Sequence, residues 1–152
     1  MRALAMVHER ILLGALSEEE METITVSTRS REQAVDITRE VQKAVTSSGV
    51  ASGVAVVCVL HTTAGITINE NADPDVMSDI TSALARLLPR TSSWAHVEGN
   101  SDAHVKSAIV GQSVTVPVEE GRLKLGTWQA VYFCEFDGPR QRRVVVQVLG
   151  AK

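Results

Sequence analysis

The sequence of 152 residues predicts an α+β domain whose sheet is mostly antiparallel. Three observations support this class. Short β-branched runs alternate with two or three segments of helical periodicity before Gly111. From Ser113 onward, four strand-like runs follow one another, and hairpin-type turns separate most of them. Connections this short join antiparallel neighbours rather than parallel strands.

The first predicted elements are a strand and a helix. Residues 22–28 alternate with a period of two and are β-branched, which indicates a strand. From Ser30 onward the apolar residues recur at intervals of three and four, which predicts a helix with Ser30 as its N-cap and Gly49 as its C-cap. The residues on its apolar face are Ala34, Val35, Ile37, Val41, Ala44 and Val45.

The middle of the chain predicts two strands and two more helices. Residues 53–60 form a continuous apolar run, which favours a strand buried on both faces, and residues 64–69 form the next strand. Asp73 and Pro74 are suited to the N-cap and first position of a helix that ends before Pro89. Its apolar stripe is Val76, Ile80, Ala83, Leu84, Leu87 and Leu88. A shorter helix is expected over residues 102–110.

The last part of the chain predicts four strands, over residues 113–118, 123–125, 127–136 and 142–149. No internal repeat or linker interrupts the pattern, so we expect one domain over residues 21–152. We expect residues 1–20 to form an N-terminal extension. They resemble a signal peptide only faintly, because His8, Glu9 and Arg10 interrupt the apolar stretch.

Composition excludes some classes of function. The net charge is −3, with 15 basic against 18 acidic residues, so the chain lacks the basic excess typical of general nucleic-acid binders. No apolar run approaches the roughly 20 residues that a membrane-spanning helix needs. Cys58 and Cys134 lie inside apolar strand-like runs, which favours free buried thiols in a cytoplasmic protein.

The polar residues gather at the boundaries between predicted elements. His61 follows the most apolar strand, and NENADPD (69–75) lies between a strand and a helix. His96 and the segment NSDAHVK (100–106) surround another helix start. GTWQ (126–129) and DGPR (137–140) lie at strand ends. Each segment alone is more often a cap, a turn or packing, but their joint occurrence favours a polar pocket on a rigid scaffold.

These side chains suit several kinds of chemistry. Imidazoles with carboxylates bind zinc or a related ion, and sets of oxygen ligands bind magnesium. Lys106 and Arg140 are candidates for an anionic group, and His61 and Glu70 for proton transfer. Trp128 is a candidate wall for a flat heterocycle. The residues alone thus suggest a metal-assisted reaction on a small phosphorylated molecule.

The motifs HTTAGITINENADPDV (61–76), WAHVEGNSDAHVKSAIVGQSVTVPV (94–118), GRLKLGTWQ (121–129) and DGPR (137–140) resemble the YjbQ family, also called UPF0047. The resemblance covers about residues 23–150. It implies an α+β protein with a mostly antiparallel β-sandwich and two to three helices, which assembles as a homotrimer. It also implies a secondary thiamine-phosphate synthase activity, which joins a hydroxymethylpyrimidine diphosphate to a thiazole phosphate with loss of diphosphate. Trp94 departs from the family pattern, because a tyrosine is usual there.

The resemblance and the residue chemistry together assign roles to the matching residues. The expected catalytic residues are His61, Glu70, Asp73 and Asp75. The expected ligand-binding residues are Asn69, Asn71, Asn100, Lys106, Trp128, Gln129 and Arg140. The expected ligands of a divalent metal, Mg²⁺ or Zn²⁺, are His61, His96, His104 and Asp102.

Two alternative functions stay open at this level. One is a metal-dependent hydrolase or phosphatase of small phosphorylated metabolites that uses the same pocket. The other is a metabolite-binding trimer without catalysis. A purely structural reading, in which the polar clusters only cap helices, predicts no concave site that joins the histidines.

Overall fold

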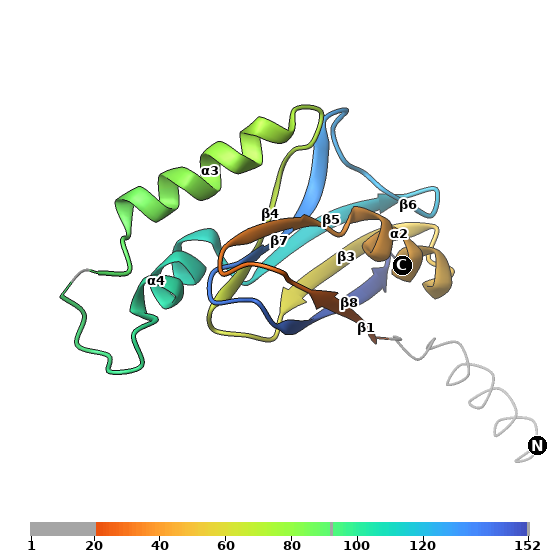
Figure 1. Ribbon diagram of the computed structural model, residues 1–152. Coiled ribbons are helices and arrows are strands. Elements are labelled where there is room, and N and C mark those ends of the chain that lie inside the picture. Colours follow the sequence, from red (N-terminus) through yellow and green to blue (C-terminus); the bar gives the residue numbers. More distant parts are fainter. Residues whose placement is uncertain (1–20, 92, 152) are drawn as a thin grey trace, which may run out of the picture.

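The computed structural model describes residues 21–91 and 93–151. Within this range the chain forms two antiparallel sheets and three helices, which confirms the predicted α+β class (Figure 1). The larger sheet has the order β1-β8-β3-β5-β6. Its strands are β1 (Met21–Ser27), β3 (Ser52–Val59), β5 (Ser113–Glu119), β6 (Arg122–Leu123) and β8 (Gln141–Gly150). The smaller sheet has the order β2-β7-β4, with β2 (Gln33–Asp36), β4 (Ala64–Glu70) and β7 (Gln129–Glu135).

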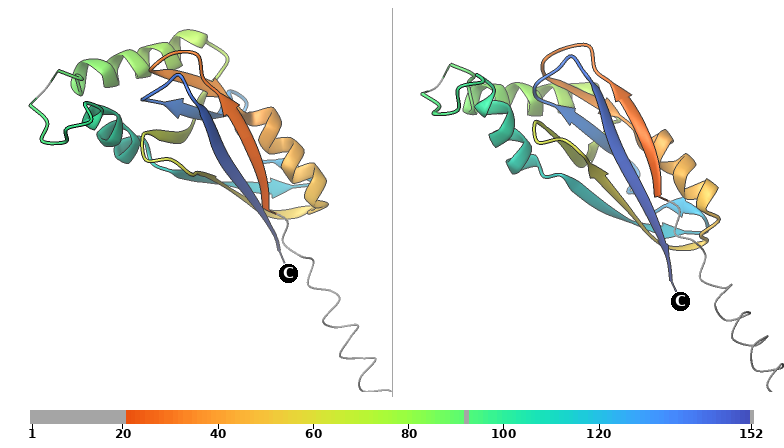
Figure 2. Two further views of the ribbon diagram at one scale, coloured as in Figure 1. Left: turned by 60° about the horizontal axis from the view of Figure 1, so that its bottom comes forward. Right: turned by 90° about the horizontal axis from the view of Figure 1, so that it is seen from below.

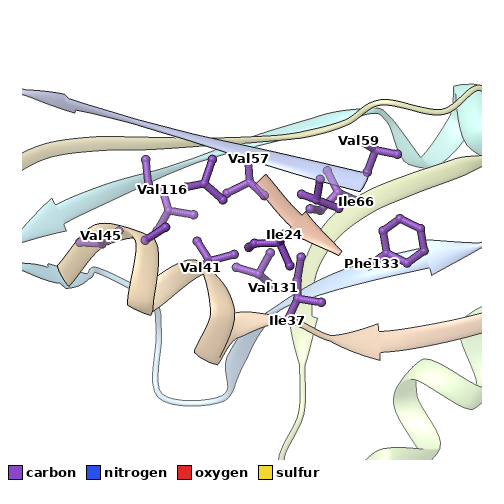
Figure 3. Packing of buried hydrophobic residues seen from close by; sticks show 14 of the residues in the cluster. Ile24, Ile37, Val41, Val45, Val57, Val59, Ile66, Val116, Val131 and Phe133 are labelled. Atoms are coloured by element: carbon purple, nitrogen blue, oxygen red, sulfur yellow. The ribbon is translucent and has the colours of Figure 1, made fainter. Parts of the chain in front are cut away.

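The main core lies between the two sheets and helix α2 (Thr38–Ser48), as the close-up of buried side chains shows (Figure 3). Helix α2 contributes Val41, Ala44 and Val45, which are buried. The strands contribute mostly valine and isoleucine. Because β-branched side chains pack well on a pleated surface, this aliphatic composition suits a sandwich core.

A second apolar cluster covers the other face of the smaller sheet. Helices α3 (Pro74–Leu87) and α4 (Ser101–Val110) lie on this side, near one end of the molecule (Figures 1 and 2). Strand β7 is buried on both faces, because alternate residues face the two clusters. Its residues Ala130, Tyr132 and Cys134 belong to the second cluster, with Met77 from α3 and Ala103 from α4.

The first predicted helix begins later than the sequence indicates. Residues 33–36 form strand β2, which pairs with β7, and α2 begins at Thr38 after Ile37. The prediction of Ser30 as N-cap is therefore wrong. Ala34 and Val35 fit the helical spacing, but they pair instead with Cys134 and Phe133 at the edge of the smaller sheet. The C-cap prediction is confirmed, because Gly49 has φ 67° in the left-handed region.

The predicted start of the second helix is confirmed, but the predicted burial of its apolar stripe is not. Asp73 caps α3, with its carboxylate accepting a hydrogen bond from the Asp75 N–H at 2.9 Å, and Pro74 is the first helical residue. Only Met77 of this helix is buried, however, and Leu87 is 76% exposed. The apolar stripe predicted to face inward is thus mostly half-buried in the single chain.

The sequence predicts that strand β3 is buried on both faces, but the described residues cover only one of them. Ala55, Val57 and Val59 lie in the main core, whereas Val54, Val56 and Cys58 are half-buried on the outer face. Strand β8 continues this outer face with Val145, Gln147 and Leu149, which pair with Cys58, Val56 and Val54.

Two further sequence predictions concern the cysteines and the membrane. Cys58 and Cys134 are both free, as predicted, but only Cys134 is buried, and Cys58 is half-buried. Burial raises the pKa of the Cys134 thiol to about 12. Over residues 21–91 and 93–151, no helix is long and apolar enough to cross a membrane.

Candidate functional site

A pocket of about 570 Å³ opens where the β3–β4 turn, the start of α4 and the β7–β8 turn meet. It brings together polar residues from four separate parts of the sequence, including two of the predicted histidines. The lining residues are Val59, Leu60, His61, Thr62, Thr63, Glu98, Asn100, His104, Gln112, Asp137, Arg140 and Arg142.

A buried ion pair forms one side of this pocket. Arg142 is 4% exposed and Glu135 is fully buried, and the Arg142 guanidinium donates to both carboxylate oxygens of Glu135 at 2.8 and 2.6 Å. Arg142 also donates to the Thr63 hydroxyl at 2.9 Å. Burial by itself raises the pKa of Glu135, but hydrogen bonds from Arg142 and the backbone outweigh it and hold that pKa below its ordinary value. The pair is therefore charged and rigid.

His61 is fixed at the mouth of the β3–β4 turn. Its Nε2 atom accepts a hydrogen bond from the Arg143 N–H at 2.8 Å, so the neutral ring carries its proton on Nδ1. Burial and the charges of Arg142 and Arg143 lower the pKa of His61. At neutral pH this ring is thus a neutral hydrogen-bond donor through Nδ1.

Asp137 organises the opposite wall. Its carboxylate accepts hydrogen bonds from the Asn100 amide at 3.0 Å, from Arg140 at 2.9 Å and from Arg31 at 2.9 Å. Arg140 also donates to the Asp137 carbonyl at 2.7 Å, which fixes its guanidinium at the turn. The Oδ1 atom of Asn100 is buried and has no hydrogen-bond partner among the residues that the structure describes.

A chain of buried charges continues from Asp137 beneath α4. Arg31 bridges Asp137 and Asp102 at 2.9 Å each, and Lys106 bridges Asp102 at 3.0 Å and Glu32 at 2.6 Å. Burial raises the pKa of Asp102, but the hydrogen bond and charge of Lys106 and the charge of Arg31 outweigh it and lower that pKa. Lys106 is only 1% exposed. It does not line the pocket and instead anchors α4, in contrast to the expected role in phosphate binding.

The expected metal-binding set does not gather in one chain. Asp102 is buried, and both of its oxygens are engaged by cationic side chains. His96 lies edge-on to His104, with ring centroids 5.5 Å apart, and faces Glu98 at 3.6 Å. Over the described ranges, no group of three or more His, Cys, Asp or Glu side chains is arranged to hold a metal ion. The four residues thus do not fit a metal site within the single chain.

The NENADPD motif lies elsewhere. His61 precedes β4, whereas Asn69 and Glu70 are its last two residues, and seven strand residues span roughly 20 Å. Several polar groups of this end have local partners. The Asn71 amide donates to Asp36 at 2.9 Å, and the Gln129 side chain accepts from the Gly126 N–H at 2.7 Å.

Trp128 lies in the loop just before β7, beside this end of β4, and is 63% exposed. The expected residues separated in this way from the pocket are Asn69, Glu70, Asn71, Asp73, Asp75, Trp128 and Gln129.

The sequence does not single out several residues of the site, among them Thr63, Glu135, Arg142 and Arg31. A signal for two of them exists in the strand alternation. Glu135 continues the inward series of Val131 and Phe133, and Arg142 continues that of Val144. A charge at an inward position predicts a buried partner of opposite sign. Arg31 lies in a loop, where no such pattern applies.

The chain is similar to proteins that carry no assigned activity. A family model described as UPF0047 protein YjbQ-like matches residues 22–151. The UPF0047 protein MJ1081 of Methanocaldococcus jannaschii is 51% identical over 84% of this chain and 92% of its own length. The UPF0047 protein YugU of Bacillus subtilis is 49% identical over 86% of this chain and 99% of its own length.

Solved structures of similar proteins share the fold of this chain. A YjbQ/UPF0047 family protein of Clostridium acetobutylicum has a TM-score of 0.83 at 52% identity, covering 84% of this chain and 99% of its own. A YbjQ-like protein of unknown function from Sulfolobus solfataricus has a TM-score of 0.84 at 35% identity, covering 88% and 99%.

Proposed function

The chain belongs to the UPF0047 (YjbQ-like) family, and from this premise we propose that its pocket binds a small phosphorylated molecule and catalyses departure of the phosphate-bearing group. The observation that carries the proposal is the pocket lining, in which Arg140 and Arg142 lie with His61 and His104. Guanidinium groups bind phosphate oxygens well, and cationic donors aimed at a leaving group stabilise the charge that develops on it.

The specific reaction we propose is that of a secondary thiamine-phosphate synthase. The bond between the methylene carbon of a hydroxymethylpyrimidine diphosphate and its diphosphate oxygen breaks, and the electron pair leaves with diphosphate. The nitrogen of a thiazole phosphate supplies the pair for the new carbon–nitrogen bond. No oxidant or reductant is needed.

Each pocket residue has a role in this step. Arg140, which is more than half exposed, binds the leaving phosphate, while Arg142, whose charge is paired with Glu135, forms a fixed part of the pocket wall. The Nδ1–H of His61 donates to a phosphate oxygen. His104 is the proton donor to the leaving oxygen, because its ring is half-buried and lines the pocket. None of these residue roles involves a metal ion.

We also propose self-association as a homotrimer, in line with the family resemblance. The outer face of the larger sheet, which residues 21–91 and 93–151 leave half-exposed, supports it. Val54, Val56 and Val145 are apolar and half-buried there, and the Gln147 amide nitrogen is buried without a hydrogen-bond partner among the described residues. A second copy is a suitable cover for such a face.

The test is turnover of the two thiamine precursors, with thiamine phosphate measured by chromatography, beside a panel of simple phosphoesters. Arg140→Gln and His104→Gln should each lower turnover at least about tenfold, because each removes a charge or proton donor at the leaving group. Arg122→Gln, which removes an exposed arginine of β6 outside the pocket, is the matched control and should not change the rate.

Other outcomes would contradict parts of the proposal. Hydrolysis of phosphoesters without coupling would favour a phosphatase. Binding without any turnover would favour a metabolite-binding trimer. Equal turnover rates for Arg140→Gln and wild type would show that the pocket does not take part in the reaction.

A further inference from the structure

Beside the arginine-lined pocket lies a second cavity, of about 370 Å³, lined by Trp94, His96, Ser101, His104 and Val105. His104 lines both cavities, so they adjoin at its ring. Their chemistry differs. The first is lined by arginine, asparagine and carboxylate groups, whereas the second presents an indole, two imidazoles and a valine side chain.

The aromatic groups of the second cavity are held in place. The Trp94 indole N–H donates to the Pro89 carbonyl at 3.2 Å, which fixes the ring at the start of the loop before α4. His96 and His104 pack edge to face, with centroids 5.5 Å apart. A fixed indole beside an edge-to-face pair offers flat apolar surface to another aromatic ring.

We infer that this second cavity is a subsite for the planar aromatic part of the ligand whose phosphate occupies the arginine-lined pocket. The inference rests on the proposed function, because it assumes that phosphate binds beside Arg140 and His61. It adds the place where the ring of such a ligand binds, and it assigns Trp94 as the wall for the ring. The sequence predicts Trp128 for that role, but Trp128 is exposed near the far end of β4.

The shared position of His104 fixes where the two parts of the ligand join. With the ring beside Trp94 and the phosphate beside Arg140, the bond between them passes His104. This is where a proton donor to the leaving oxygen must lie, so the subsite also orients the ligand for the proposed reaction.

Binding of three probes to the full chain tests the inference: inorganic phosphate, methyl phosphate and phenyl phosphate, measured by calorimetry. Phenyl phosphate should bind wild type at least about tenfold more tightly than methyl phosphate, because only it fills the second cavity. Trp94→Ala should abolish this preference and leave the affinity for inorganic phosphate unchanged. Trp94→Leu keeps apolar volume without a flat face, so it should retain part of the preference for phenyl phosphate. It also provides a second variant for the case in which Trp94→Ala does not fold.

A matched pair on α4 provides the control. Val105 lines the second cavity, whereas Ile109, one helical turn later, is 62% exposed and lines neither cavity. Val105→Asn should reduce the aryl preference, and Ile109→Asn should not. In a Trp128→Phe background Trp94 is the one tryptophan left, so its fluorescence should respond to phenyl phosphate more than to methyl phosphate.

The outcomes separate the two claims. Binding of all three probes with equal affinity, or an aryl preference that survives both Trp94 variants, would overturn the subsite and leave the phosphate pocket intact. Failure of every probe to bind would overturn the phosphate pocket, and the subsite with it.

Discussion

At the scale of single residues, the site depends on charges that the fold buries in pairs. Glu135 and Arg142 are inward residues of strands β7 and β8, and each has the other as its main partner. Further hydrogen bonds to Glu135 come from Thr28 and from the backbone N–H groups of Phe136 and Asp137. Such a pair contributes little net stability compared with apolar residues, but the loss of one partner is costly, because the other stays buried and charged.

We therefore predict that Glu135→Gln lowers the free energy of unfolding by about 3–5 kcal/mol at neutral pH. The measurement is urea denaturation followed by circular dichroism. The control is Glu119→Gln, which removes an exposed carboxylate paired with Lys124 and should cost less than about 1 kcal/mol. Similar losses for both variants would contradict the buried role of Glu135.

The same pair predicts a pH dependence. The pKa of Glu135 lies below its ordinary value of 4.5 in the folded chain, so the unfolded chain binds more protons in the window between the two values. Its contribution is complete above the ordinary value and is lost as the pH falls through the native pKa. The stability difference between wild type and Glu135→Gln should thus shrink below about pH 4. A constant difference down to about pH 2 would contradict this assignment.

At the scale of elements, the packing of α4 on β4 positions the site. The Ser107 hydroxyl donates to the Ala64 carbonyl at 2.6 Å, and the Ile66 N–H donates to the Gly111 carbonyl at 2.9 Å. This contact leaves no room for a side chain at position 65. A Cβ on Gly65 would lie 2.8 Å from the Gly111 oxygen. The helix that carries His104 is therefore held by its C-terminal end against the start of β4.

Gly65→Ala should displace α4, lower the free energy of unfolding by about 1–3 kcal/mol, and weaken phosphate binding, because His104 and Asn100 move with the helix. Stability and phosphate affinity are both measured. Gly121→Ala is the control of comparable cost, since it forces alanine into a turn with φ 71° at the far end of the larger sheet. If both variants bind phosphate as wild type does, α4 does not position the site.

The β2–α2 segment shows how tertiary contacts override local spacing. Ala34 and Val35 have helical intervals to Ile37 and Val41, yet they lie in a strand, because β7 offers an unpaired edge. The helix then begins at Thr38, whose hydroxyl donates to Asp36 and accepts from the Val131 N–H.

At the scale of the whole molecule, the residues that the structure describes leave the outer face of the larger sheet half-exposed. Val56 lies at the centre of the outer face of the larger sheet, opposite Gln147 on β8 and Thr115 on β5. The continuous apolar run of β3 is the sequence of a strand with both faces covered. Since the described chain covers one face, a second copy is the expected cover of the other.

Wild type should therefore elute with about three times the 16.4 kDa mass of the chain in size-exclusion chromatography with light scattering. Val56→Glu should shift the mass to that of one chain, because a buried carboxylate is not tolerated in an apolar interface. Lys124→Glu, which reverses an exposed charge on the segment after β6, is the control and should leave the mass unchanged. A monomeric wild type would overturn the proposed trimer.

The sequence determined the fold class, most element boundaries and the family, because β-branched alternation, turn residues and capping signals such as Asp73 and Gly49 act locally. It also identified His61, Asn100, His104 and Arg140, which do line one pocket. Only the tertiary structure separated these residues from NENADPD, since both ends of β4 carry polar motifs and spacing along the chain does not say which end faces α4. The burial of Lys106 and the pairing of Glu135 with Arg142 are likewise visible only in the tertiary structure. Burial and charge pairing depend on contacts between residues far apart in sequence.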